Sequence, residues 1–187
     1  MFSLEAARRL MESWIQAESL RRHLYAVEAA MGYYARHFGQ DEQSWRIVGV
    51  LHDLDYERHP SPEEHPYVAV AYLRTLGLPE SWLEAILAHA DYTGVPRQSL
   101  MARALYAVDE MSGFVLACAY VRPQGIEDLQ PSSVLKKMKD KAFAAAVGRE
   151  ELRRGAEELG LPLEEHIGHV IAALRAEAER LGLARRA

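Results

Sequence analysis

The sequence is poor in residues that would cross-link the chain or anchor it in a membrane. Only Cys118 among its 187 residues is a cysteine, which excludes an intrachain disulfide and a site with several thiolate ligands. The longest apolar run, around Phe114 to Val121, is far shorter than the roughly 20 residues that a membrane-spanning helix needs. The first residues show no basic segment followed by an apolar one, so no secretory signal is predicted. We therefore expect a cytoplasmic protein with no membrane partner.

Asparagine is absent and lysine is scarce. Arginine outnumbers lysine 18 to 4, and all four lysines fall within residues 136–141. A loss of thermolabile amides is typical of a heat-adapted, thermophilic protein, although a codon bias would give the same counts. Positive charge is not in excess either, because the formal net charge is -5, whereas nucleic-acid-binding domains usually carry a basic face. Nucleic acid is therefore not an expected partner.

Helical periodicity is present along almost the whole chain. In the first segment Leu4, Leu10 and Trp14 belong to an apolar series with three- and four-residue steps, the spacing of one helix face. Strand-like alternation does not persist beyond a few residues. The sequence thus predicts an all-α fold of about eight or nine helices. The helices that can be bounded lie at residues 4–14, 20–38, 41–54, from 62, 79–90, 99–119, across the lysine window, and 162–183.

The helix from residue 62 is predicted from a capping box. Ser61 is its expected N-cap, Pro62 its first helical position, and Glu64 the residue whose side chain reaches back. This reading places His65 in the first turn of that helix.

A boundary between two parts of the chain is predicted between Tyr120 and Ser133. Pro123, Gly125 and Pro131 interrupt the helical pattern there. We expect residues 1–120 to form a helical domain and residues 121–187 a helical C-terminal extension packed on the same domain.

Three positions place polar residues in apolar surroundings. The pair His52-Asp53 ends the apolar run of residues 47–51, and His23 and Asp109 interrupt apolar helices elsewhere. Each of these residues alone would pass as a hydrogen-bonded structural residue. A buried carboxylate is costly without a cation, however, and the helical pattern offers Asp53 and Asp109 no basic neighbour. A divalent metal would remove that cost.

The order His23, His52-Asp53 and Asp109 resembles the HD superfamily of metal-dependent phosphohydrolases, which carries His, His-Asp and Asp on successive helices. The match covers about residues 15–120, and the chain looks similar to the small stand-alone HDIG-type proteins of that superfamily. The resemblance implies an HD-domain helical bundle for residues 1–120, followed by the C-terminal extension. It also implies that these four residues are metal ligands.

Two further histidines, His65 and His89, extend the resemblance to superfamily members with two-metal centres. Both precede Asp109, and with Asp53 they would hold a second ion. The alternative is a surface histidine at a helix start and a capping histidine at a helix end.

The chain departs from the family pattern after the doublet, where Asp55 and Tyr56 replace a glycine and a basic residue. A phosphate-binding role at the basic position is thereby put in doubt. Asp55 joins Asp53 as a candidate catalytic residue, because it could hold a water or orient a histidine. The alternative is a carboxylate in solvent at a helix end.

A divalent ion on histidine and carboxylate ligands can bind water and a phosphoryl oxygen together. These ligands suit Mn, Fe, Co, Ni, Zn or Mg and do not choose among them, and one or two ions would fit. The resemblance implies hydrolysis of a phosphate ester by metal-activated water. A nucleotide or another small phosphorylated metabolite is the expected substrate, and the oligomeric state stays open.

The lysine window supplies candidate contacts to the substrate phosphate: Lys136, Lys137 and Lys139. The alternative is a solvated helix face, which is how runs of charge usually behave. His169 lies three positions after His166, whereas the two histidines of a zinc-protease helix lie four positions apart. The pair therefore does not match that motif, and both residues are expected to flank a packing face.

Two rival functions remain at this stage. The superfamily also contains di-iron oxygenases that use the same six ligands. A regulatory or interaction module with a structural or vestigial metal site is the other rival.

Overall fold

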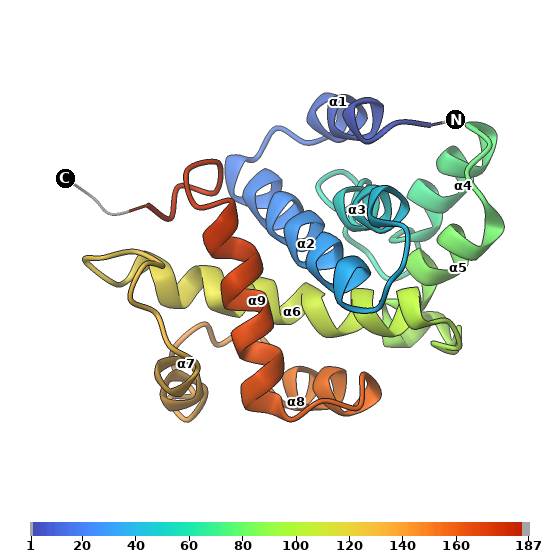
Figure 1. Cartoon of the computed structure of the whole chain (residues 1–187). Helices are drawn as coiled ribbons and strands as arrows, with labels where there is room; N and C mark the ends of the chain where they lie inside the picture. Colours follow the sequence, from blue (N-terminus) through green and yellow to red (C-terminus); the bar gives the residue numbers. More distant parts are fainter. Residues whose placement is uncertain (1, 185–187) are drawn as a thin grey trace.

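The computed structural model describes residues 2–184, and in this range every regular element is helical (Figure 1). The all-α prediction is confirmed, since these residues form α-helices, one short 3₁₀ turn and no strand. The elements are α1 (Leu4–Trp14), α2 (Glu18–His37), α3 (Glu42–Leu51), α4 (Tyr67–Thr75), α5 (Glu80–Ala88), η1 (Asp91–Thr93), α6 (Leu100–Tyr120), α7 (Pro131–Met138), α8 (Arg149–Glu158) and α9 (Leu163–Ala176).

Helix α6 is the central element of the molecule. It runs through the middle of the molecule, and helices α2, α5, α8 and α9 all pack against it (Figure 1). Its buried residues lie on nearly every side of the helix, as expected of an element enclosed by others. The helix begins at an N-cap, where the Ser99 hydroxyl accepts a hydrogen bond from the Ala102 N–H. Asp109 is thus held in the middle of a rigid, enclosed helix.

A buried carboxylate ties the first three helices together. Glu28 of α2 is fully buried, and Arg8 of α1 and Arg46 of α3 both donate hydrogen bonds to it. The Nη2 of Arg46 lies 2.7 Å from Glu28 Oε1, and the Nε of Arg8 lies 3.0 Å from Glu28 Oε2. A buried charge is tolerated when it is paired and hydrogen-bonded in this way. The ion pairs fix α2, which carries His23, against α3, whose end leads directly into His52 and Asp53.

The predicted start of the fourth helix is wrong. Helix α4 begins at Tyr67, and residues 62–66 form turns instead of the helix predicted from Pro62. The reason is Pro66, which has no N–H to donate and disfavours helical geometry at the residue before it. His65 therefore lies in the turn ahead of α4 rather than in its first turn.

Two helix ends also fall short of the predicted bounds. Helix α3 ends at Leu51 rather than Leu54, because the chain continues in tighter turns after the His52-Asp53 pair. Helix α9 ends at Ala176 rather than residue 183. The turns that follow bury both Leu181 and Leu183, which a straight helix would point in nearly opposite directions.

Helix α8 was not predicted at all. Its sequence is dominated by charged residues and contains Gly155, a weak helix former. Tertiary packing accounts for it, because Gly155 lies directly against α6. A Cβ at residue 155 would lie 2.7 Å from the Cα of Ala107, so only glycine permits so close an approach.

The C-terminal helices pack on the earlier ones. Helix α9 contacts α2 and α6, α8 contacts α6, and α7 contacts α9 (Figure 1). The division of the chain at residue 120 stays a prediction. Within residues 2–184, no helix combines the length and the apolar character that a bilayer crossing requires.

Candidate metal centre

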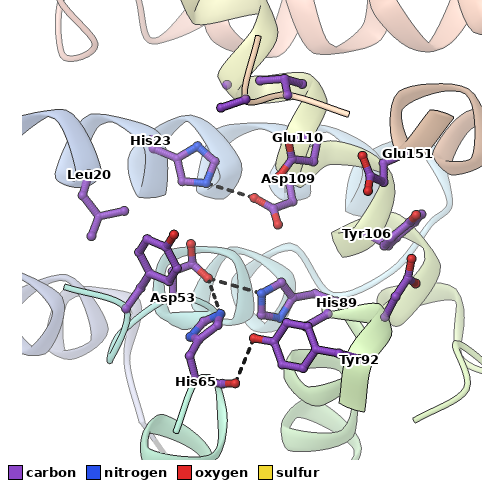
Figure 2. A pocket seen from close by; sticks show the side chains of 16 residues that line it. Leu20, His23, Asp53, His65, His89, Tyr92, Tyr106, Asp109, Glu110 and Glu151 are labelled. Atoms are coloured by element: carbon purple, nitrogen blue, oxygen red, sulfur yellow. Dashed lines mark hydrogen bonds and ion pairs between the residues drawn. The ribbon is translucent and has the colours of Figure 1, made fainter. Parts of the chain in front are cut away.

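Asp53 lies just beyond the end of α3, close to the turn that precedes α4 and to the end of α5. Its Oδ1 lies 3.3 Å from the Nε2 of His65, which precedes α4, and 3.2 Å from the Nε2 of His89 at the end of α5 (Figure 2). The same oxygen lies 3.5 Å from the Nε2 of His52. Three imidazole rings from distant parts of the sequence therefore converge on one carboxylate oxygen.

Asp109 of α6 gathers the remaining predicted ligands. Its Oδ1 lies 2.9 Å from the Nε2 of His23 on α2 and 3.2 Å from the Nε2 of His52 (Figure 2 shows the first pair). His52 thus lies between the two carboxylates and is itself fully buried.

The six predicted side chains form two overlapping donor groups that could each hold a metal ion. Within each group the donor atoms all lie within 4.8 Å of one another. Asp53 belongs to both groups, as the sequence reading of two adjacent ions requires. The first group is His23, His52, Asp53 and Asp109, and the second is Asp53, His65 and His89.

The hydrogen bonds of the three central histidines leave their Nε2 atoms free to act as ligands. The Nδ1 of His52 lies 2.8 Å from the carbonyl oxygen of Gly49, and the Nδ1 of His89 contacts the carbonyl oxygen of Ile86. A carbonyl can only accept, so Nδ1 carries the proton. In a neutral ring, Nε2 then offers a lone pair toward a carboxylate oxygen. Two acceptors so close together need a cation between them, so this donor set fits a divalent metal.

Without a metal, protons serve as these cations. Burial by itself would lower the pKa of His52, but the negative charges of Asp53 and Asp109 raise it to about 10. Burial likewise opposes the charged form of His65, and its bonds to Asp53 and Asp55 raise its pKa to about 9. Burial raises the pKa of both Asp53 and Asp109, but the charge of His52 and the hydrogen bonds of the surrounding histidines outweigh this and leave both below the usual value. Metal binding must therefore displace protons.

Asp55 lies behind His65 rather than in the cavity. It is fully buried, so the alternative of a solvent carboxylate is wrong. Its Oδ1 lies 2.7 Å from the Nδ1 of His65, and its Oδ2 accepts the Ala69 N–H of α4 at 2.7 Å. Both oxygens are engaged by protein groups. This geometry corresponds to the orienting role considered for Asp55 above.

A cavity of about 560 Å³ opens beside the histidine–aspartate cluster. No lysine or arginine is among its described lining residues. Five of them are carboxylates. Burial and the neighbouring charge of Asp109 raise the pKa of one of these, Glu110, to about 7. The lining residues are Leu20, His23, Asp53, Tyr56, His65, His89, Ala90, Asp91, Tyr92, Tyr106, Asp109, Glu110, Gly113, Ala146, Val147 and Glu151.

The structure does not bring the lysine window to this cavity. Lys136 and Lys137 line a separate hollow of about 370 Å³ beside Cys118, near the other end of α6. Lys137 also lies over the ring of Phe143, 4.6 Å from its centroid. Lys139 is exposed after the end of α7. A phosphate-binding role for these lysines stays a prediction that their placement does not support.

Several cavity residues were missed in the sequence reading, among them Tyr106, Glu110 and Glu151. Tyr106 lies three positions before Asp109 on α6, so a helical projection from Asp109 would have found it, whereas Glu110 follows Asp109 directly. Glu151 lies on α8, whose charged sequence gave no signal that it approaches the site.

Comparison with known proteins gives one match. A family model described as HD domain matches residues 20–113, which is half of the chain and includes all six clustered ligands. No curated protein and no solved structure matches.

Proposed function

The chain belongs to the HD domain family, and from this membership and the two joined donor groups we propose that it is a metal-dependent hydrolase of phosphate esters. Its substrate is a nucleotide or another small phosphorylated metabolite. Its cofactor is one or two divalent ions drawn from Mn, Fe, Co, Ni, Zn or Mg.

The observation that carries this proposal is the sharing of Asp53 between two donor groups at the wall of an open cavity. A carboxylate that contributes to two neighbouring sites is the arrangement that binuclear hydrolytic centres require. The cavity is of the size that small-molecule ligands occupy.

The chain's own residues would hold and orient the cofactor. When bound, a divalent metal neutralises charge on a phosphoryl oxygen and lowers the pKa of water. His23, His52 and Asp109 would hold one ion, and His65 and His89 a second, with Asp53 serving both. The buried Asp55 keeps the proton of His65 on Nδ1 and so keeps its Nε2 turned toward Asp53.

Two alternatives use the same residues. Because the six ligands suit iron, a di-iron oxygenase is the first, and it would consume oxygen in the presence of iron. A non-catalytic regulatory module is the second, and it would bind metal tightly without turning over any phosphate ester.

The test combines metal analysis of the purified protein with a phosphate-release screen over nucleotides and sugar phosphates under several metals. We expect turnover that His52→Ala and Asp53→Ala abolish together with metal binding, while helical content is kept. His59→Ala is the matched control, because His59 lies outside both donor groups and pairs with Glu64. Full metal occupancy in His52→Ala and Asp53→Ala would refute the assignment of these residues as metal ligands.

A further inference from the structure

Beyond the proposed hydrolysis, and resting on it, we propose that Tyr106, Glu110 and Glu151 form a second binding region that selects the organic part of the substrate. The preferred substrate is a phosphate monoester whose organic part offers hydroxyl or amino groups and carries no second anionic group. The region lies on the side of Asp109 away from His23 (Figure 2).

The first support is the charge of the cavity wall. Glu110 and Glu151 line the cavity, and neither forms an ion pair with lysine or arginine in residues 2–184. Asp91, which also lines the cavity, is different. Arg97 and Arg154 each reach one of its oxygens at 2.9 Å. The two arginines therefore neutralise the Asp91 carboxylate. The carboxylates of Glu110 and Glu151 stay available as hydrogen-bond acceptors for a ligand.

The second support is the way in which the fold places Glu151. Gly155 brings α8 against α6, and Glu151 lies one helical turn before it. The Glu151 carboxylate folds back over Gly148, where a Cβ would lie 1.3 Å from its Oε2. Two glycines thus permit the position that this carboxylate takes at the cavity.

The third support is an unpaired polar atom. Tyr106 lines the cavity and is only 6% exposed, and its buried hydroxyl has no hydrogen-bond partner among the described residues. The guanidinium of Arg97 lies over its ring, 3.7 Å from the centroid, and holds the ring in place. A buried hydroxyl without a partner is costly, and a hydrogen bond to a ligand would remove that cost.

These features select substrates by the charge of their organic part. The phosphoryl group is drawn to the metal-binding cluster, because a bound divalent ion would place positive charge directly at the cavity, whereas Arg97 and Arg154 are already paired with Asp91. A second phosphate or carboxylate on the substrate would face Glu110 and Glu151 with no lysine or arginine of the lining to neutralise it. A hydroxyl or ammonium group would instead donate to these carboxylates.

The test uses a matched pair of esters, glycerol 1-phosphate and 3-phosphoglycerate, which differ by a hydroxymethyl group in place of a carboxylate. We expect kcat/KM to be at least about tenfold higher for the glycerol ester, as expected for one unscreened like-charge contact. Glu151→Gln keeps the shape and removes the charge, and it should shrink this ratio about fivefold without changing metal content. Glu150→Gln is the control, because Glu150 is exposed and outside the cavity.

A binding experiment separates this inference from the proposed hydrolysis. The phosphonate analogues of the same two compounds are titrated by calorimetry into metal-loaded wild type and Glu151→Gln. The inference would be supported, even if neither ester were hydrolysed, by two results together. Wild type would bind the glycerol analogue more tightly than the other analogue, and Glu151→Gln would show no such preference. Hydrolysis of both esters at equal kcat/KM would overturn the region and leave the hydrolase standing. Equal binding, or no binding, of both analogues would also overturn it.

Discussion

The imidazole of His65 donates its Nδ1 proton to Asp55 at 2.7 Å, and the other oxygen of that carboxylate accepts the Ala69 N–H in the first turn of α4. One buried side chain thus orients a metal-facing ring and satisfies the start of the next helix. Helix N-termini carry unsatisfied N–H groups, and α4 has no side-chain cap at Pro66. Asp55 therefore couples the geometry of the metal centre to the folding of the segment that follows it.

Asp55→Asn should weaken both roles, because a single amide oxygen cannot replace two carboxylate oxygens. We expect metal affinity of the group containing His65 to fall about 10- to 100-fold, with a loss of stability of about 1–3 kcal/mol. Titration calorimetry and chemical denaturation measure the two effects. Asp41→Asn is the control, since Asp41 caps α3 far from the site and should change stability alone. Unaltered metal affinity in Asp55→Asn would refute the orienting role.

The two donor groups predict a stoichiometry of two ions per chain. His23→Ala should remove the ion that Asp109 helps to hold, and His89→Ala the other, so each variant would retain one. Metal analysis after equilibrium dialysis gives the count. A wild type that saturates at one ion, with His89→Ala unchanged, would reduce the centre to the first group.

Because the lysine window lies away from the cavity, replacing its lysines should not change catalysis. Lys136→Ala and Lys137→Ala should leave kcat and KM within about twofold of wild type, because surface charges that touch no substrate have small effects. Steady-state kinetics on the best substrate of the screen checks this. A rise in KM without a change in metal content would show instead that these lysines reach the substrate phosphate.

His166 predicts a loss of stability in acid that is independent of the metal. Burial lowers its pKa to about 4, whereas the unfolded chain binds the proton with the ordinary value near 6.5. Because the unfolded state binds more protons below about 6.5, the free energy of unfolding falls as pH drops from there toward 4, by on the order of 3 kcal/mol.

The measurement is chemical denaturation between pH 4 and about 7 in the presence of a chelator. His166→Gln cannot titrate and still offers a donor to the Ala107 carbonyl, which His166 contacts through Nε2 at 2.8 Å. Its acid slope should be shallower than that of wild type, and His37→Gln, at an exposed position, should not change the slope. Parallel slopes in wild type and His166→Gln would contradict the prediction.

The candidate metal ligands could be proposed from sequence because the carboxylates among them are costly in their surroundings without a cation. Carboxylates such as Asp53 and Asp109 in apolar surroundings need a compensating charge, and the helical pattern offered them none. The resemblance to superfamily members with two-metal centres then added His65 and His89. The role of Asp55 could not be decided in this way, because a carboxylate at a helix end is equally acceptable in solvent and behind a ligand.

The features that sequence reading missed depend on tertiary packing. The capping-box pattern at Ser61 predicts a helix start that the chain does not use, because Pro66 disfavours a continuous helix there and α4 begins at Tyr67. Helix α8 has few apolar residues, and it is held by the burial of Leu152, Gly155 and Ala156, with Gly155 directly against α6. The second wall of the cavity, with Glu151, could not be predicted without that contact.

The residue at position 155 acts as a spacer between the part of the molecule that carries the candidate metal ligands and the cavity wall facing it. The HD match ends at residue 113, so the metal ligands and α8 lie in separate stretches of sequence. A larger side chain at residue 155 would push α8 outward and widen the cavity without altering a single ligand. Proteins with this metal centre could therefore diverge in substrate size through one small residue far from the chemistry.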